Sequence, residues 1–245
     1  MTQTIEVLKE EIEEMAQEQA DEAAKAKVGL PAHIKAATQA VIRVNGEDAG
    51  RGFVVKAGHL PVVITAAHCL PHLPPPHLGR FRSEYNYEQL LGPLGGKATV
   101  WAECLFVDPM SDVAVLGEPD GQAFYEQNDA YYELTDDIEP LRIAPAKLFP
   151  LPEAPHCADM RVPHTPAWML SLDGTWFCCG YRSHGRFLQL QTEAPIQGGM
   201  SGSPILDNDG AAIGLVSISS GGRHAEGTCA SLAEALPGWL RRQMT

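Results

Sequence analysis

Residues 62–70 read VVITAAHCL, an apolar run rich in β-branched residues that ends at His68 and Cys69. Val, Ile and Thr favour extended backbone because their branched side chains pack well on a pleated surface. The run therefore predicts a buried β-strand with a histidine at its end. A single histidine in such a place is most often structural, so a chemical role for His68 needs partners elsewhere in the chain.

Short β-like runs of this kind recur from about residue 37 onward, with turn residues between them. This spacing favours an all-β barrel or sandwich over alternating βα units. We expect strands in AVIRV (40–44), GFVV (52–55), VVITAA (62–67), ATVWAECLFV (98–107), DVAVL (112–116), FLQLQT (187–192), SPIL (203–206) and AIGLVSIS (212–219). Residues 74–96 predict a long surface loop between strands. Residues 118–139 carry eight acidic residues and no basic one, and predict a solvated connection between two halves.

Two further stretches supply candidate partners for His68. FVDPMSDVAVL (106–116) places Asp112 directly before an alternating strand, and IQGGMSGSPIL (196–206) places Ser201 in a glycine-rich turn. A serine hydroxyl becomes a nucleophile only with a general base, a carboxylate that orients the base, and donors for the oxyanion. Asp108 is a rival for the carboxylate, and we favour Asp112 because it adjoins the strand. The order His68, Asp112, Ser201 is one of three known for such a triad.

These stretches resemble the motifs of trypsin-like serine proteases of the chymotrypsin fold. TAAHC (65–69) is similar to the histidine motif, DVAVL (112–116) to the aspartate motif and GMSGSP (199–204) to the nucleophile motif. The form Gly-x-Ser-Gly-Ser-Pro is most similar to the staphylococcal glutamyl endopeptidases, and GRGFVV (50–55) to bacterial trypsin-like enzymes generally. The resemblance covers residues 37–242 and identifies the chain as a bacterial-type, intracellular variant of the family.

The resemblance implies two six-stranded antiparallel β-barrels with the active site between them. We expect a first barrel over about 37–120, an acidic linker over about 118–140 and a second barrel over about 141–235. LPGWLRR (236–242) resembles the C-terminal helix of the family, so a short helix is expected over about 233–242. The acidic segment 1–30 would be a separate helix before the protease domain.

The resemblance also implies a serine endopeptidase that acts on protein or peptide substrates through an acyl-enzyme. His68 would be the general base, Asp112 would orient it, and Ser201 would be the nucleophile. The N–H groups of Gly199 and Ser201 would form the oxyanion hole. An esterase-type acyl hydrolase with the same triad, or an interaction protein with an idle triad, are the alternatives. We expect no organic cofactor, and no metal, because the HCLPH run (68–72) has no second ligand cluster.

Specificity is less evident, because several family positions are altered. Pro195 stands where trypsin has an acidic residue, and Ile196 follows it. Ser217, Ile218 and Ser219 match the strand that pairs with substrate, and Ser219 would narrow the pocket. In the loop SGGRHAEG (220–227), Arg223 or His224 would favour an acidic side chain and Glu226 a basic one; we favour small or medium apolar groups. Met200 replaces the aspartate that captures a new N-terminus in trypsin-like zymogens, so that mode of activation is absent.

Composition excludes several classes of partner. The net charge of −13 argues against a nucleic acid, and no apolar run approaches the length of a membrane span. The N-terminus lacks the pattern of a secretory signal. The six cysteines are sparse, and Cys69 has no cysteine before it, so the family's bridge at this position is absent. Together these features predict reduced thiols and a cytoplasmic location.

Residues 1–27 differ from the rest of the chain. They contain eight acidic residues, three lysines, no Gly and no Pro. Apolar residues recur every three or four positions, at Ile5, Leu8, Ile12 and Met15, which predicts an amphipathic helix. This helix either packs on its own domain or docks a regulatory or scaffold protein.

Overall fold

A computed structural model describes residues 30–45, 49–75, 85–145, 165–192, 194–219 and 226–244. The chain divides into two units, Met1–Ala32 and His33–Thr245. The predicted acidic helix of residues 1–30 belongs to the first unit and lies, apart from Leu30, outside the described residues. The architecture below is that of the second unit.

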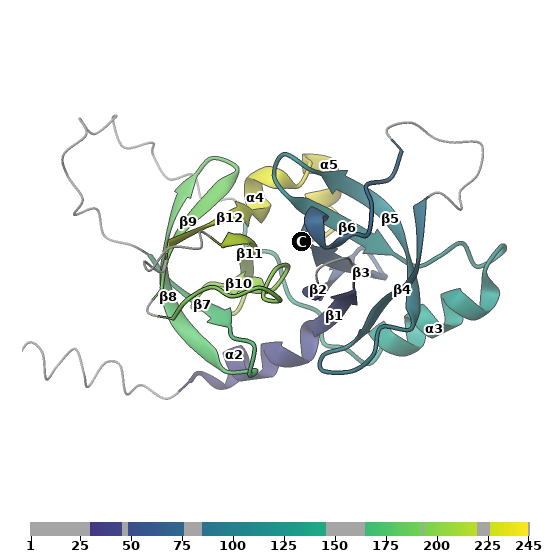
Figure 1. The fold of residues 1–245 in the computed structure, drawn as a ribbon, viewed down its shortest axis with the longest axis horizontal. Coiled ribbons are helices and arrows are strands. Elements are labelled where there is room, and N and C mark those ends of the chain that lie inside the picture. Colours follow the sequence, from purple (N-terminus) through teal and green to yellow (C-terminus); the bar gives the residue numbers. More distant parts are fainter. Residues whose placement is uncertain are drawn as a thin grey trace, which may run out of the picture. The chain divides into compact units, whose positions relative to one another are not determined.

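Six antiparallel strands form the first barrel, coloured purple to teal in Figure 1. They are β1 (Val41–Asn45), β2 (Ala49–Ala57), β3 (Leu60–Thr65), β4 (Asn86–Pro93), β5 (Val100–Asp108) and β6 (Val113–Gly117). The sheet closes in the order β1-β2-β3-β6-β5-β4, with β1 paired to both β2 and β4.

The second barrel, green to yellow in Figure 1, repeats this topology. Its strands are β7 (Thr165–Leu170), β8 (Trp176–His184), β9 (Phe187–Thr192), β10 (Pro204–Leu206), β11 (Ala212–Ser219) and β12 (Glu226–Ser231). They close in the order β10-β11-β12-β9-β8-β7. The prediction of two closed six-stranded antiparallel barrels is confirmed.

Each barrel encloses an apolar core. Along β9, Leu188, Leu190 and Thr192 are buried while the residues between them are exposed, the period of two that a strand with one buried face requires. The core of the second barrel gathers the side chains of Ala144, Ala167, Met169, Cys179, Tyr181, Leu188, Leu190, Met200, Ile205, Ala211, Ile213, Val216 and Cys229. Each large apolar side chain that is fully buried contributes about 1.5–3 kcal/mol to folding.

The prediction of a surface loop over residues 74–96 is wrong for its second half, because β4 lies there. Tyr87, Leu90 and Leu91 are buried in this strand and complete the wall of the first barrel. The apolar residues of this strand lie among polar ones and are followed by Gly92 and Pro93, so the sequence does not show the alternation typical of a strand. Strands β7, β8 and β12 were also missed, since each carries Gly, Pro or charged residues within its run.

The helices that flank the barrels are short and lie before, between and after them. Within the acidic stretch 118–139 lies α3 (Tyr125–Thr135), a helix that the sequence does not predict; it packs against β5 and buries Tyr131, whose hydroxyl donates to Pro61 O. The predicted C-terminal helix is divided into α4 (Leu232–Ala235) and α5 (Gly238–Arg241). Pro237 causes the break, because a proline disfavours helical backbone in the residue before it. Before β1 lie α2 (Ala32–Ala36) and η1 (Ala37–Ala40).

Candidate active site

His68 and Asp112 meet at the end of the first barrel. His68 lies in η2 (Ala67–Cys69), directly after β3, and Asp112 lies in the turn before β6. The ring Nδ1 of His68 is 2.7 Å from Asp112 Oδ2, and the backbone N–H of His68 donates to Oδ1 at 2.9 Å. A carboxylate can only accept, so Nδ1 carries the hydrogen and Nε2 of the neutral ring has its lone pair free to act as a base.

The carboxylate of Asp112 has a third donor from the second barrel. The hydroxyl of Ser217, in β11, donates to Oδ2. Ser217 was predicted from sequence only as part of a substrate-pairing strand, and this side-chain contact had no sequence signal. Burial raises the pKa of Asp112, but the hydrogen bonds from His68 and Ser217 outweigh it and hold the pKa below its ordinary value.

Asp112 shifts the ionisation of His68 in the opposite direction. Hydrogen bonds to Asp112 and, to a smaller extent, to the neighbouring Cys69 raise the pKa of His68 to about 10. The imidazole is half-exposed, with 39% of its side-chain surface accessible, whereas Asp112 is largely covered at 15%. The arrangement therefore stabilises the protonated imidazolium, the form that a general base takes after it has accepted a proton.

Asp108, the rival carboxylate, points to other partners. It accepts hydrogen bonds from the N–H groups of Met110 and Ser111 and from the Ser111 hydroxyl, and its Oδ2 lies 2.8 Å from Arg186 of the second barrel. Burial raises the pKa of Asp108, and these bonds together lower it below the ordinary value. Its contacts shape the turn that carries Asp112.

Ser201 lies in a tight turn between the second barrel's core and the first barrel. Gly199 and Gly202 adopt φ values of 89° and 78°, backbone that glycine reaches without strain. Gly202 N–H donates to Val216 O at 2.7 Å, and Ser201 O accepts from Arg51 N–H of β2, also at 2.7 Å. A Cβ at Gly202 would clash with the Arg51 carbonyl oxygen, so this residue has to be glycine.

The N–H groups of Gly199 and Ser201 have no acceptor among the hydrogen bonds of the described residues, while the intervening Met200 N–H donates to Gln197 O at 3.1 Å. Two neighbouring donors without partners can bind a developing negative charge. The side chain of Met200 is buried in the second barrel's core. The turn thus presents two N–H groups beside the Ser201 hydroxyl.

Gly50 lies at the contact between the two halves of the candidate site. The position that a Cβ would take there overlaps Cys69 Sγ and lies 3.1 Å from Ser201 O. This brings the backbone of Ser201 close to the residue that follows His68. No hydrogen bond joins Ser201 Oγ to His68 within the described part of the chain. In free enzymes this bond is often long and shortens only when substrate binds.

The predicted specificity residues lie beside the Ser201 turn. Ile196 packs against the core of the second barrel, and Pro195 precedes it on an irregular segment. Backbone pairing of β11 with β10 reaches Leu215, whereas residues 218–219 pair only with β12 in the described sheet. The side chains of Ile218 and Ser219, like residues 220–225, lie outside the described part. On its other edge, β11 is bonded as far as Val216, whose carbonyl group accepts from Gly202 N–H and whose N–H donates to Ser203 O.

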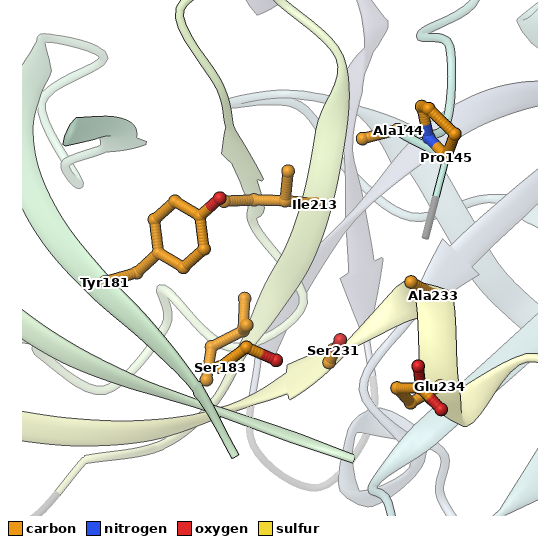
Figure 2. Close-up of a pocket in the computed structure, with 9 residues that line it drawn as sticks. Ala144, Pro145, Tyr181, Ser183, Ile213, Ser231, Ala233 and Glu234 are labelled. Atoms are coloured by element: carbon orange, nitrogen blue, oxygen red, sulfur yellow. The ribbon is translucent and has the colours of Figure 1, made fainter. Parts of the chain in front are cut away.

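A separate pocket, whose lining contains none of the candidate triad residues, lies against the second barrel (Figure 2). Its lining is Ala144, Pro145, Tyr181, Ser183, Leu188, Ile213, Ser231, Ala233 and Glu234. In the ranges that the structure describes, no cluster of His, Cys, Asp or Glu forms a set of metal ligands. None of the helices in those ranges has the length and apolar character needed to cross a membrane.

Comparison with known proteins extends these observations. Residues 50–215 match the family model of the trypsin-like peptidase domain, a range that includes His68, Asp112 and Ser201. A serine endoprotease from Yersinia pestis is similar in fold, with a TM-score of 0.51 and 19% identity over 87% of this chain and 68% of that one. The Rv3671c protease of M. tuberculosis, in its inactive form, has a TM-score of 0.49 and 16% identity, with 87% of this chain and 92% of that one covered. A serine protease of a human pathogenic astrovirus has a TM-score of 0.44 and 16% identity, with 82% of this chain and 94% of that one covered. No curated protein is significantly similar in sequence.

Proposed function

Since the chain belongs to the trypsin-like peptidase family and is a serine protease, we propose that it is an endopeptidase with the triad His68, Asp112 and Ser201. The observation that carries this proposal is the pair of hydrogen bonds between Asp112 and His68, which leaves Nε2 as the base on the side of the imidazole away from the carboxylate. The Ser201 turn supports the same assignment, because the N–H groups of Gly199 and Ser201 have no acceptor among the described residues.

The reaction follows from these positions. His68 Nε2 accepts the hydroxyl proton as Ser201 Oγ attacks the substrate carbonyl, and the Gly199 and Ser201 N–H groups stabilise the oxyanion. The imidazolium, stabilised by Asp112, then gives its proton to the leaving amine, which leaves an acyl-enzyme on Ser201. Water, deprotonated by the same imidazole, attacks the acyl-enzyme, and the imidazolium returns that proton to Ser201 Oγ as the acid product leaves. No proton is lost or gained by the protein over the cycle.

A peptide substrate is favoured over a simple ester by β11. Its edge beyond Val216 can accept an extended chain through backbone hydrogen bonds, with Ser217, Ile218 and Ser219 in that part of the strand and Pro195 and Ile196 as further substrate contacts. Comparing matched peptide amides and esters tests this choice. Turnover of esters alone would favour the alternative of an esterase-type hydrolase.

Ser201→Ala tests the nucleophile directly. A fluorophosphonate should label the wild-type protein once, and Ser201→Ala should lose both labelling and peptide cleavage because the hydroxyl is gone. Ser183→Ala, a change in β8 outside the site, is the matched control and should label normally. Labelling that persists in Ser201→Ala would contradict the assignment, and failure of the folded wild type to react would favour an idle triad.

We also propose a cytoplasmic location, on the basis of the thiols. Cys69, Cys104, Cys179 and Cys229 are buried and form no disulfide. Reduced cysteines are typical of cytosolic proteins, whereas secreted members of such families are commonly cross-linked.

The N-terminal segment supports a proposal about control. Because Met200 cannot provide the zymogen ion pair, regulation needs another element, and the apolar stripe of residues 1–27 could bind a regulatory or scaffold protein. Deleting residues 1–27 should abolish partner association without changing the melting temperature or peptidase activity. A large fall in melting temperature would show that the segment is structural.

A further inference from the structure

Arg51 is a buried arginine in the strand that faces the Ser201 turn. It lies in β2 between Gly50 and Gly52, and 6% of its surface is accessible. A buried guanidinium is uncommon and destabilising unless acceptors surround it. Its partners therefore indicate what it holds together.

The guanidinium binds three successive carbonyl groups of the second barrel. Its Nη1 donates to Leu170 O at 3.2 Å and to Ser171 O at 2.8 Å, and Nη2 donates to Leu172 O at 3.1 Å. These carbonyls lie where β7 ends and its turn toward β8 begins. Nη1 also lies 3.5 Å from Ser203 Oγ, two residues after the proposed nucleophile.

The backbone of Arg51 contacts the nucleophile turn itself. Its N–H donates to Ser201 O at 2.7 Å, and its carbonyl oxygen leaves room only for a hydrogen on Gly202 Cα. The hydroxyl of Thr65 in β3 donates to the same carbonyl at 2.7 Å, which fixes the Arg51 peptide within the first barrel. Arg51 thus contacts each of the three successive residues 201, 202 and 203.

The turn that Arg51 binds reaches the proposed oxyanion hole. Leu172 Cδ2 lies 3.4 Å from the position that a Cβ on Gly199 would take. Burial lowers the pKa of Arg51, and the nearby Asp173 raises it in part. Because guanidinium groups stay charged in proteins, the buried side chain needs its carbonyl acceptors. A lysine ammonium group cannot donate to all of them in the planar arrangement of a guanidinium.

We propose that Arg51 is a positioning residue that sets the geometry of the oxyanion hole, by tying the turn after β7, and through it Leu172, to the Gly199–Ser201 backbone. This inference rests on the proposed serine-protease function of the same turn. The backbone bond to Ser201 O survives any side-chain change. The guanidinium is therefore the part that substitution tests.

The experiment compares Arg51→Met and Arg51→Lys with Arg43→Met. Arg43 pairs with Arg51 across β1 and β2, and in the described part of the chain its guanidinium donates to Gly96 O and Asn45 Oδ1. For each variant, kcat and KM on a peptide amide are measured, together with the Kd of a peptide boronate, which mimics the tetrahedral intermediate, and of the cleaved peptide product. Melting temperature is followed in parallel.

Arg51→Met should lower kcat about 100-fold with KM nearly unchanged, the size expected when a catalytic group is misplaced by about 1 Å. Boronate affinity should fall in parallel with kcat while product affinity holds, and Arg51→Lys should recover only part of the loss. Arg43→Met should match the wild type. A change confined to KM or to melting temperature would overturn the proposal, since a purely structural arginine would not discriminate between the boronate and the product.

If Arg51→Met does not fold, Arg51→Lys is used in its place, because it retains the charge and most of the volume. The comparison is again between the loss of boronate affinity and the loss of product affinity. Wild-type kcat and boronate affinity in a folded Arg51 variant would contradict the inference while the triad stands. Failure of the wild type to bind the boronate and to react with a fluorophosphonate would instead contradict the proposed function.

Discussion

At the scale of single residues, the candidate site depends on strained or buried groups with specific partners. Asp112 adopts a φ of 55°, a left-handed conformation that costs a non-glycine residue of order 1–3 kcal/mol. Three hydrogen bonds, two from His68 and one from Ser217, are aimed at its carboxylate. Contacts from both barrels therefore stabilise this strained conformation of Asp112.

The raised pKa of His68 predicts the pH dependence of activity. The imidazole accepts a proton only when neutral, so kcat/KM should rise with pH through the pKa of His68. Hydrogen bonds to Asp112 and, to a smaller extent, to Cys69 raise that pKa from 6.5 to about 10, so the midpoint of the rise should lie on the alkaline side of 6.5. Measuring kcat/KM against pH on a peptide ester checks the direction.

Asp112→Asn should lower the pKa of His68 and reduce kcat about 10⁴-fold, since an amide stabilises the wrong tautomer of the imidazole. NMR titration of His68 in the Ser201→Ala background reports the pKa independently of turnover. Asp108→Asn is the control, because that carboxylate does not contact His68. If Asp108→Asn moved the titration and Asp112→Asn did not, the wrong carboxylate would have been assigned.

At the scale of elements, the turn between β5 and β6 carries Asp112 and is closed by Asp108. Asp108 caps Met110 and Ser111, and reaches Arg186 in the turn between β8 and β9. Ser111 is fully buried, and Arg186 Nη1 also lies 3.3 Å from its hydroxyl. The proposed catalytic carboxylate of Asp112 is thus supported by a capped turn and by a hairpin of the other barrel.

Asp108→Ala should destabilise the protein by about 2 kcal/mol, because it removes several hydrogen bonds of the turn. Arg186→Ala should cost less than about 1 kcal/mol, since that side chain is 58% exposed and the ion pair is screened by water. Urea unfolding measures both values. An equal or larger loss for Arg186→Ala would mean that the contact between barrels, and not the capped turn, carries the stability.

At the scale of the whole molecule, the site is assembled from two barrels that are separate in the sequence. His68 and Asp112 come from the first barrel, and Ser201 and Ser217 from the second. After α3, the chain forms isolated parallel bridges from Leu141 to Val55 and from Ile143 to Ala212, and so adds backbone pairing to each barrel. Both barrels must fold before the site exists.

Reductant should change neither the melting temperature nor the activity of the whole molecule. The four buried cysteines of the two barrels form no bridge, so the described part of the barrels has no cross-link that reduction could remove. Thiol titration of the denatured protein without reductant should detect at least these four groups. A large fall in melting temperature on reduction would show paired cysteines and contradict the cytoplasmic proposal.

The fold and the family could be predicted from sequence because their signals are local. A β-branched run before His68, an alternating run after Asp112 and a glycine-rich turn around Ser201 are each contained in about ten residues. Strand β4 was missed because its apolar residues are irregularly spaced: the pairing of β4 with β5 shifts register between Tyr87 and Leu91. Such a shift breaks the period of two that identifies a strand.

The sequence by itself determined the class of fold, the order of the candidate catalytic residues and the absence of a zymogen aspartate at Met200. Only the tertiary structure decided that Ser217 donates to Asp112, that Asp108 caps a turn and that Arg51 binds the turn after β7. These partners lie 105 residues apart for Ser217 and 119–121 for Arg51. The acceptors of Arg51 are backbone carbonyls, which every residue carries, so no residue type marks them in advance. Their selection depends on closing both barrels, and that is a property of the folded chain.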